Sequence, residues 1–141
     1  MSTLPLRLQS FMEDLVVKRE GALDRLGELF TDDVRFRDPF RETRGLDAFR
    51  ETFASMFRRY PTLSFSDFVC TGDAQAFTLT YVMCLRMAVG PTFTIHMATV
   101  CRTRGDRIED YADYFDLGLG VTSPIPVLSA AYRKAVAMIF L

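Results

Sequence analysis

Apolar residues in the first sixty positions recur at helical spacing. Two such runs lie before and after Gly21, and a third covers residues 46–60, where Pro61 ends it. Between them, residues 34–39 alternate between apolar and charged side chains, which is typical of a strand buried on one face. The pattern predicts a helix broken or bent near Gly21, a short strand, and a further helix.

The second half of the chain changes to segments rich in β-branched and aromatic residues, joined by short polar connections. These segments predict antiparallel strands at residues 63–70, 74–87, 92–104 and 107–116. A stretch with three kinds of breaker residue follows, and the apolar segment 126–141 predicts a terminal helix. The order predicts an α+β fold in which N-terminal helices pack on the concave face of a curved antiparallel sheet, with an added C-terminal helix.

Composition limits the possible chemistry. The 141 residues carry a formal net charge of −1, so we expect one globular domain with no charge-based reason to bind nucleic acid. His96 is the single histidine, which excludes a metal site with two histidine ligands and leaves acid–base chemistry to carboxylates. Cys70, Cys84 and Cys101 lie in apolar runs and are typical of reduced core thiols, which predicts a cytoplasmic protein. We expect no metal, no other cofactor and no membrane span.

Residues 26–57, LGELFTDDVRFRDPFRETRGLDAFRETFASMF, contain an acidic pair, an alternating strand, Asp-Pro, a glycine and an amphipathic helix. With RIEDYADYFD at residues 107–116, this order resembles the nuclear transport factor 2-like superfamily, whose nearest members are SnoaL-like polyketide cyclases, ketosteroid isomerase and limonene epoxide hydrolase. The resemblance covers residues 7–118. It implies a cone-shaped fold with a deep apolar pocket and a homodimer formed through the outer sheet face. Residues 1–118 then form the SnoaL-like part, and residues 119–141 are an extension of the same domain.

Asp38 is the first candidate catalytic residue. It shares strand parity with Val34 and Phe36, so we expect its carboxyl on the apolar side, where desolvation raises the pKa of a carboxylate. By the resemblance to ketosteroid isomerase, this aspartate is the base that abstracts a proton. Alternatively, Asp38 caps the backbone amides of an Asp-Pro turn, and a salt bridge to a nearby arginine would favour that alternative.

Asp113 and Asp14 are the other candidates. The motif around Asp113 is similar to that of limonene epoxide hydrolase, in which the aspartate helps to activate water; alternatively, Asp113 bonds to a tyrosine or an arginine and orients its strand. Counting back from Asp38 without gaps places Asp14 where ketosteroid isomerase has its tyrosine donor, and aligning RGDRI with the last turn of that family places its aspartic acid donor near Thr99. Because those donors and the Arg-x-Asp of the epoxide hydrolase are missing, the sequence disfavours both reactions.

The leading hypothesis places Asp14, Asp38 and Asp113 in one cavity. Two carboxyl groups in one cavity rarely ionise together, so one can act as an acid and the other as a base. The hypothesis is a cyclase or isomerase that acts on a hydrophobic carbonyl compound; the alternative is a non-catalytic member that binds an apolar ligand or a protein partner. The side chains expected to contact the small molecule are Phe36, Phe53, Tyr81, Met83, Met97, Thr99, Tyr111 and Phe115.

His96 and the terminal helix each allow more than one role. His96 has the opposite strand parity to Thr99 and is expected on the other face of the sheet; with a reversed register it would be the obvious acid–base residue. The terminal helix is too apolar to remain in water unless it packs, so we expect it to close the pocket mouth or to extend a dimer interface. A membrane anchor is disfavoured because Arg133 and Lys134 interrupt a segment that is already short for a span.

Overall fold

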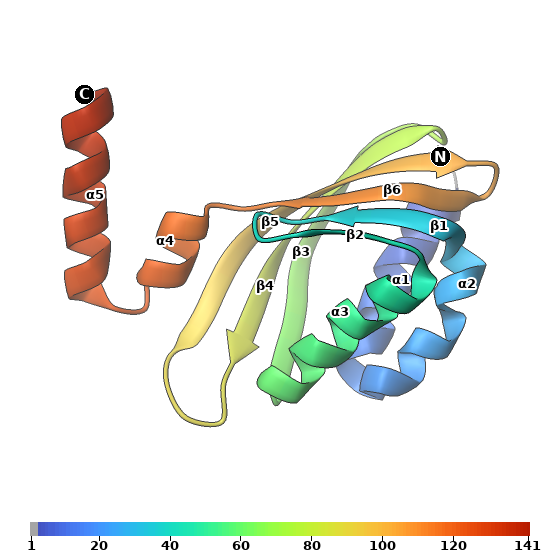
Figure 1. Ribbon diagram of the computed structural model, residues 1–141, viewed down its shortest axis with the longest axis horizontal. Helices are drawn as coiled ribbons and strands as arrows, with labels where there is room; N and C mark the ends of the chain where they lie inside the picture. The colour runs from blue at the N-terminus through green and yellow to red at the C-terminus, as the bar shows by residue number, and fades with distance from the viewer. Residues whose placement is uncertain (1–2) are drawn as a thin grey trace.

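The computed structural model describes residues 3–141, and the chain has an α+β fold, as predicted. The helical elements are α1 (Thr3–Lys18), the 3-10 helix η1 (Arg19–Arg25), α2 (Leu26–Leu29), α3 (Leu46–Arg59), α4 (Leu117–Thr122) and α5 (Pro126–Phe140). The strands are β1 (Phe30–Arg37), β2 (Glu42–Arg44), β3 (Thr62–Gly72), β4 (Ala76–Arg86), β5 (Thr92–Arg104) and β6 (Arg107–Tyr114). Helices α1 and α3 lie against one face of a curved sheet, and α5 stands apart from it (Figure 1).

The sheet has the strand order β2-β1-β6-β5-β4-β3. Strands β3 to β6 form the predicted antiparallel meander, in which each strand pairs with the next along the chain. The sheet as a whole is mixed, because β1 pairs in parallel with β6. From β1 the chain passes through β2 and α3 to the far edge of the sheet, and the meander then returns β6 to the side of β1.

Three local features differ from the sequence-based expectation. Strand β1 begins at Phe30, because Phe30 already pairs with Ile108 of β6 through an irregular register, and the short strand β2 was not predicted. The predicted break near Gly21, in contrast, is present, since α1 ends at Lys18 and Arg19 has a φ of 51°. The breaker-rich stretch after Asp116 contains α4, whose first turn the Asp116 carboxylate caps at the Leu119 amide.

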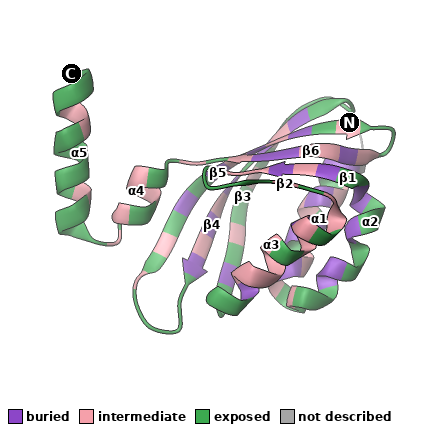
Figure 2. Cartoon of the chain, viewed as in Figure 1, coloured by how far each residue is buried: buried purple, intermediate pink, exposed green. Residues whose placement is uncertain are grey.

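The hydrophobic core lies between the helices and the sheet (Figure 2). Phe30 and Phe49 are fully buried and their rings meet edge to face, with centroids 4.7 Å apart. The ring of Tyr111 in β6 lies 5.7 Å from Phe30 and 5.3 Å from Phe49. These aromatic contacts hold α3 on β1 and β6, which places the helix opposite the inward-facing residues of the sheet.

Helix α5 projects away from the body of the protein, and none of its residues is buried (Figures 1 and 2). Helix α4 connects it to the sheet, since Gly120 lies beside Ile95 of β5. The ring of Tyr132 from α5 occupies the space that a Cβ would need at Gly118, so only glycine permits this approach between the two helices. Within residues 3–141, no helix is both long enough and apolar enough to cross a membrane.

Candidate functional site

A cavity of about 550 Å³ lies between the helices and the concave face of the sheet. Alternate residues of β4 and β5 point into it, because successive side chains of a strand project to opposite faces. Of the side chains predicted to contact a small molecule, the cavity is lined by Phe36, Phe53, Tyr81, Met83, Met97, Tyr111 and Phe115. A ligand of moderate size and largely apolar character would fit this space.

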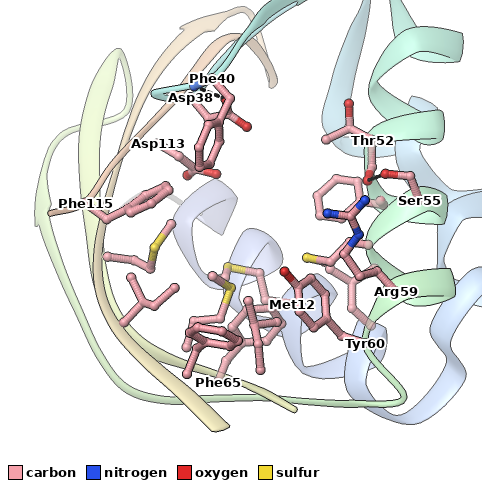
Figure 3. A pocket seen from close by; sticks show the side chains of 18 of the residues that line it. Met12, Asp38, Phe40, Thr52, Ser55, Arg59, Tyr60, Phe65, Asp113 and Phe115 are labelled. Carbon is pink, nitrogen blue, oxygen red and sulfur yellow. Dashed lines mark hydrogen bonds between the residues drawn. The ribbon is translucent and has the colours of Figure 1, made fainter. Parts of the chain in front are cut away.

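Asp113, on β6, presents its carboxyl group to the cavity from the sheet wall (Figure 3). Thr99 lies opposite it on β5, and the Thr99 hydroxyl donates a hydrogen bond of 2.5 Å to Asp113 Oδ1. The Tyr81 hydroxyl lies 3.1 Å from Thr99 Oγ1. Since the single Thr99 proton is given to Asp113, Tyr81 acts as the donor to Thr99. A chain of hydrogen bonds therefore orients the carboxyl group, and Oδ2 accepts no hydrogen bond from any residue between 3 and 141.

The pKa of Asp113 is raised from 3.8 to about 7. Burial among apolar and aromatic side chains is the main cause, because it disfavours the charged form. The hydrogen bond from Thr99 opposes this shift, and the negative charge of Asp38 adds to it. Near neutral pH, this carboxyl group is therefore present in both protonation states and can either accept or donate a proton.

The phenols of Tyr81 and Tyr111 stay protonated beside it. Burial raises the pKa of both hydroxyl groups well above the ordinary value, and the charge of Asp113 raises these pKa values further. Both rings line the cavity next to the carboxyl group. Both phenols are therefore neutral groups of the cavity wall, and the proton of Tyr81 is given to Thr99.

Asp38 also lines the cavity, but its oxygens are already occupied. Oδ1 accepts hydrogen bonds from the backbone amides of Phe40 (2.8 Å) and Arg41 (2.9 Å). Oδ2 pairs with the Arg41 guanidinium at 3.3 Å. These are the contacts of the alternative role, a turn cap with a salt bridge. They hold Phe40 at the cavity rim, where its ring centroid lies 6.1 Å from that of Phe115 (Figure 3).

Asp14 and Thr99 do not line the cavity, in contrast to the prediction. Asp14 does not line the cavity: Met12 and Leu15 take the inward positions on α1, and Asp14 faces outward to pair with Lys18 at 3.0 Å and Arg25 at 3.4 Å. The predicted meeting of three aspartates is therefore reduced to two. Thr99 is fully buried behind Asp113 and does not line the cavity itself. It reaches the site through its hydrogen bond to Asp113.

His96 lies on the outer face of the sheet, as its strand parity predicts. It is exposed and borders a shallow depression with Val82 and Tyr114, on the side opposite the cavity. Among the described residues, no group of three or more histidine, cysteine, aspartate or glutamate side chains could hold a metal ion.

A second polar wall, which sequence reasoning missed, lies on α3. The polar side chains there are Thr52, Ser55, Arg59 and, directly after the helix, Tyr60. The sequence already places these residues together, because Thr52, Ser55 and Arg59 share a helix face with the apolar Met56. Polar residues within the apolar stripe of an amphipathic helix indicate that this face of the helix lines a cavity. They face Asp113 from across the cavity (Figure 3).

Comparisons with known proteins agree with this architecture. A family model described as a SnoaL-like domain matches residues 9–111. A protein of ketosteroid isomerase-like fold from Catenulispora acidiphila, solved with trimethylamine, is 21% identical, with a TM-score of 0.70 over 83% of this chain and 89% of that chain. A candidate SnoaL-like polyketide cyclase from Jannaschia sp. is 14% identical, with a TM-score of 0.75 over 87% and 91% of the two chains.

An epoxide hydrolase similar to limonene epoxide hydrolase, from M. tuberculosis, is 16% identical, with a TM-score of 0.69 over 97% of each chain. At these identities the solved structures show a shared fold and nothing about the reaction. A search of curated proteins found no match.

Proposed function

Because the chain belongs to the family of SnoaL-like domains, we propose that it binds a hydrophobic carbonyl compound and isomerises or cyclises it with Asp113 as the acid–base group. The reaction needs no cofactor in this proposal. Asp113 takes a proton from the carbon next to the carbonyl group, which leaves an enol or enolate. The same carboxyl group then returns the proton to another atom of the substrate, so the proton balance is closed.

One observation carries the proposal: Asp113 is a carboxyl group with a pKa of about 7 on the wall of an apolar cavity. A base works best when its pKa is close to the working pH, because enough of it is ionised and it still binds a proton well. Oδ1 is held by Thr99, which leaves Oδ2 available to a substrate. Asp38 supports the role electrostatically, and its contacts with the turn make it a positioning residue.

Proton abstraction can be tested without knowledge of the natural substrate. We would incubate the protein with 2-tetralone, an apolar ketone with exchangeable protons, in D₂O at neutral pH and follow deuterium incorporation by NMR. The expected result is exchange above the buffer rate, reduced by about a hundredfold or more in Asp113→Asn, since a positioned base contributes about that much.

The matched control is Asp110→Asn. Asp110 lies on the same strand, but its carboxylate pairs with Arg37 at 3.2 Å and does not line the cavity. We expect this variant to keep the full exchange rate. Exchange that is equal in the wild type and in Asp113→Asn would contradict the catalytic role. Binding of the ketone without exchange would favour the alternative function, a non-catalytic protein that binds apolar ligands.

A further inference from the structure

The cavity separates its polar groups by charge. Two carboxyl groups, Asp113 and Asp38 with its partner Arg41, lie on the side of the sheet, and the hydroxyl and guanidinium groups of the α3 wall lie across from them (Figure 3). Apolar side chains such as Met12 and Met97 line the space between. A ligand with polar groups at both ends would therefore be oriented by this arrangement.

Two donors on the α3 wall have no protein partner. The guanidinium of Arg59 makes no ion pair or hydrogen bond with any residue from 3 to 141, although the neighbouring Arg58 pairs with Glu51. The phenol of Tyr60 likewise makes no hydrogen bond within that range. Arg19 holds this end of α3 in place, because its guanidinium donates to the carbonyl oxygens of Phe57 and Tyr60, both at 2.9 Å. Arg19 therefore fixes the backbone that carries both donors, and the Arg59 side chain lies at the exposed edge of the cavity.

We propose that the ligand of this cavity carries a carboxylate, which binds Arg59 and Tyr60 while its carbonyl end faces Asp113. A guanidinium binds a carboxylate through two parallel hydrogen bonds, and a phenol can add a third. In the reverse orientation the ligand carboxylate would lie beside the ionised form of Asp113, which disfavours it, and the Arg41 guanidinium on that side is already paired with Asp38. The proposal rests on the proposed function for the identity of the site, and it adds the chemical class of the ligand.

Equilibrium binding tests this class directly. Naphthalene-2-carboxylate and the neutral naphthalene-2-carboxamide have the same shape, and calorimetry at mildly alkaline pH compares their affinities. We expect the wild type to bind the acid about tenfold or more tightly than the amide, as for a charge-assisted hydrogen bond. Arg59→Gln should abolish this preference, and the control Arg58→Gln, which changes the same charge outside the cavity, should retain it.

Three results would overturn the proposal: equal binding of acid and amide by the wild type, a preference that survives in Arg59→Gln, or no binding of the acid up to about 1 mM. The measurement does not depend on turnover. Failure of the deuterium exchange with an intact preference for the acid would therefore refute only the acid–base function. Exchange without the preference would refute only the carboxylate.

A separate observation concerns the surface of α5. Met138 is 80% exposed and Phe140 is 77% exposed, and most of the other apolar side chains of the helix are exposed as well. The ring of Tyr132 packs directly on Gly118 of α4 and so holds the helix in this position. Because this helix exposes apolar surface away from its own domain, we expect another molecule to bury that surface.

The pattern of α5 fits a second copy of the same helix. Leu128, Ala131, Ala135 and Met138 follow the three- and four-residue spacing of a helix–helix seam, and the two alanines permit close approach. By the same helical spacing, Arg133 points away from this seam.

We propose that α5 pairs with α5 of a second copy along this seam. The large apolar side chains on the seam side of the helix expose about 500 Å² per copy, at about 100 Å² each; they are Val127, Leu128, Tyr132, Met138 and Ile139. Two copies then bury about 1,000 Å², which is the area that a biological interface must reach.

Two alanines on opposite faces of α5 provide the test. Light scattering over a concentration series should find a dimer for the wild type, a monomer for Ala135→Asp on the seam, and a dimer for the control Ala130→Asp on the other side. Both variants make the same substitution in the same helix, so a general loss of helix stability affects them equally. Circular dichroism confirms that each variant is folded.

A wild type that stays monomeric up to about 100 μM would overturn this pairing, and so would an Ala135→Asp variant that remains a dimer. If that dimer dissociated in Tyr114→Asp instead, the interface would lie on the outer face of the sheet, because Tyr114 is exposed there. Monomers that bind phosphatidylcholine vesicles through α5 would equally refute the pairing and make a membrane surface the partner.

Discussion

Asp113→Asn should stabilise the protein at alkaline pH. The substitution keeps the shape of the side chain and leaves Oδ1 to accept the hydrogen bond from Thr99. It removes the charge that the cavity must otherwise accommodate when the carboxyl group ionises. The expected gain follows from the difference between the pKa of Asp113 in the folded state and in the unfolded state.

The sign of the effect follows from proton linkage. Folding raises the pKa of Asp113 from 3.8 to about 7, so the folded state binds the proton more tightly than the unfolded state. The resulting stability is fully present below the unfolded value and is lost as the pH rises through the folded value. One pKa unit corresponds to about 1.4 kcal/mol, so the wild type should lose about 2 to 3 kcal/mol between about pH 5 and about pH 8. Solvent screening of the half-buried carboxylate makes this an upper value.

Urea unfolding followed by far-ultraviolet circular dichroism measures this loss at both pH values, and the chain contains no tryptophan for a fluorescence assay. The exposed carboxylates whose pKa values are lowered, Asp33, Glu42 and Asp73, act only below this window, because they lose their contribution as the pH falls.

The variant should therefore show a smaller loss of stability than the wild type over the same pH range. Asp110→Asn serves as the control, since it removes a carboxylate from the same strand without altering the cavity. Parallel pH dependence in the wild type and in Asp113→Asn would refute the desolvation of Asp113.

Three further predictions concern the surroundings of the site. Thr99→Val should raise the pKa of Asp113 further, because it removes a hydrogen bond that favours the charged form, and the pH profile of deuterium exchange should shift upward. Gly72→Ala should destabilise the β3–β4 hairpin by about 1 to 3 kcal/mol, measured by urea unfolding, since Gly72 has a φ of 117° and a Cβ would lie 2.4 Å from the Ala76 oxygen. Arg19→Met should cost about 1 to 3 kcal/mol in the same assay and weaken acid binding, because the carbonyl oxygens at the end of α3 lose their donor.

The sheet and the cavity wall followed from strand periodicity. Alternation predicted that Tyr81, Met83 and Met97 share the inner face and that His96 points outward, and the structure confirms each of these positions. Parity carries this information because a strand with one buried face tolerates no slip of register. The SnoaL-like family was likewise predicted from the order of its motifs.

Other details of the site could not be predicted, because they depend on contacts that the sequence pattern does not show. The placement of Asp14 in the cavity came from counting positions without gaps, and the count could not show that Met12 and Leu15 take the inward face of α1. The salt bridge of Asp38 depends on how the turn brings Arg41 back to it. The polar wall of α3 was visible as spacing, but its meaning requires knowing that Asp113 lies across the cavity.

The proposed acid–base function depends most directly on the ionisation of Asp113, and one titration measures it. Carbon-13 NMR of the aspartate carboxyl groups, with the Asp113 signal assigned by its absence in Asp113→Asn, gives the pKa in the intact protein. We expect a transition with a midpoint at about pH 7. A midpoint near the ordinary value of about 3.9 would contradict it, because the cavity would then hold only a permanently ionised carboxylate at neutral pH.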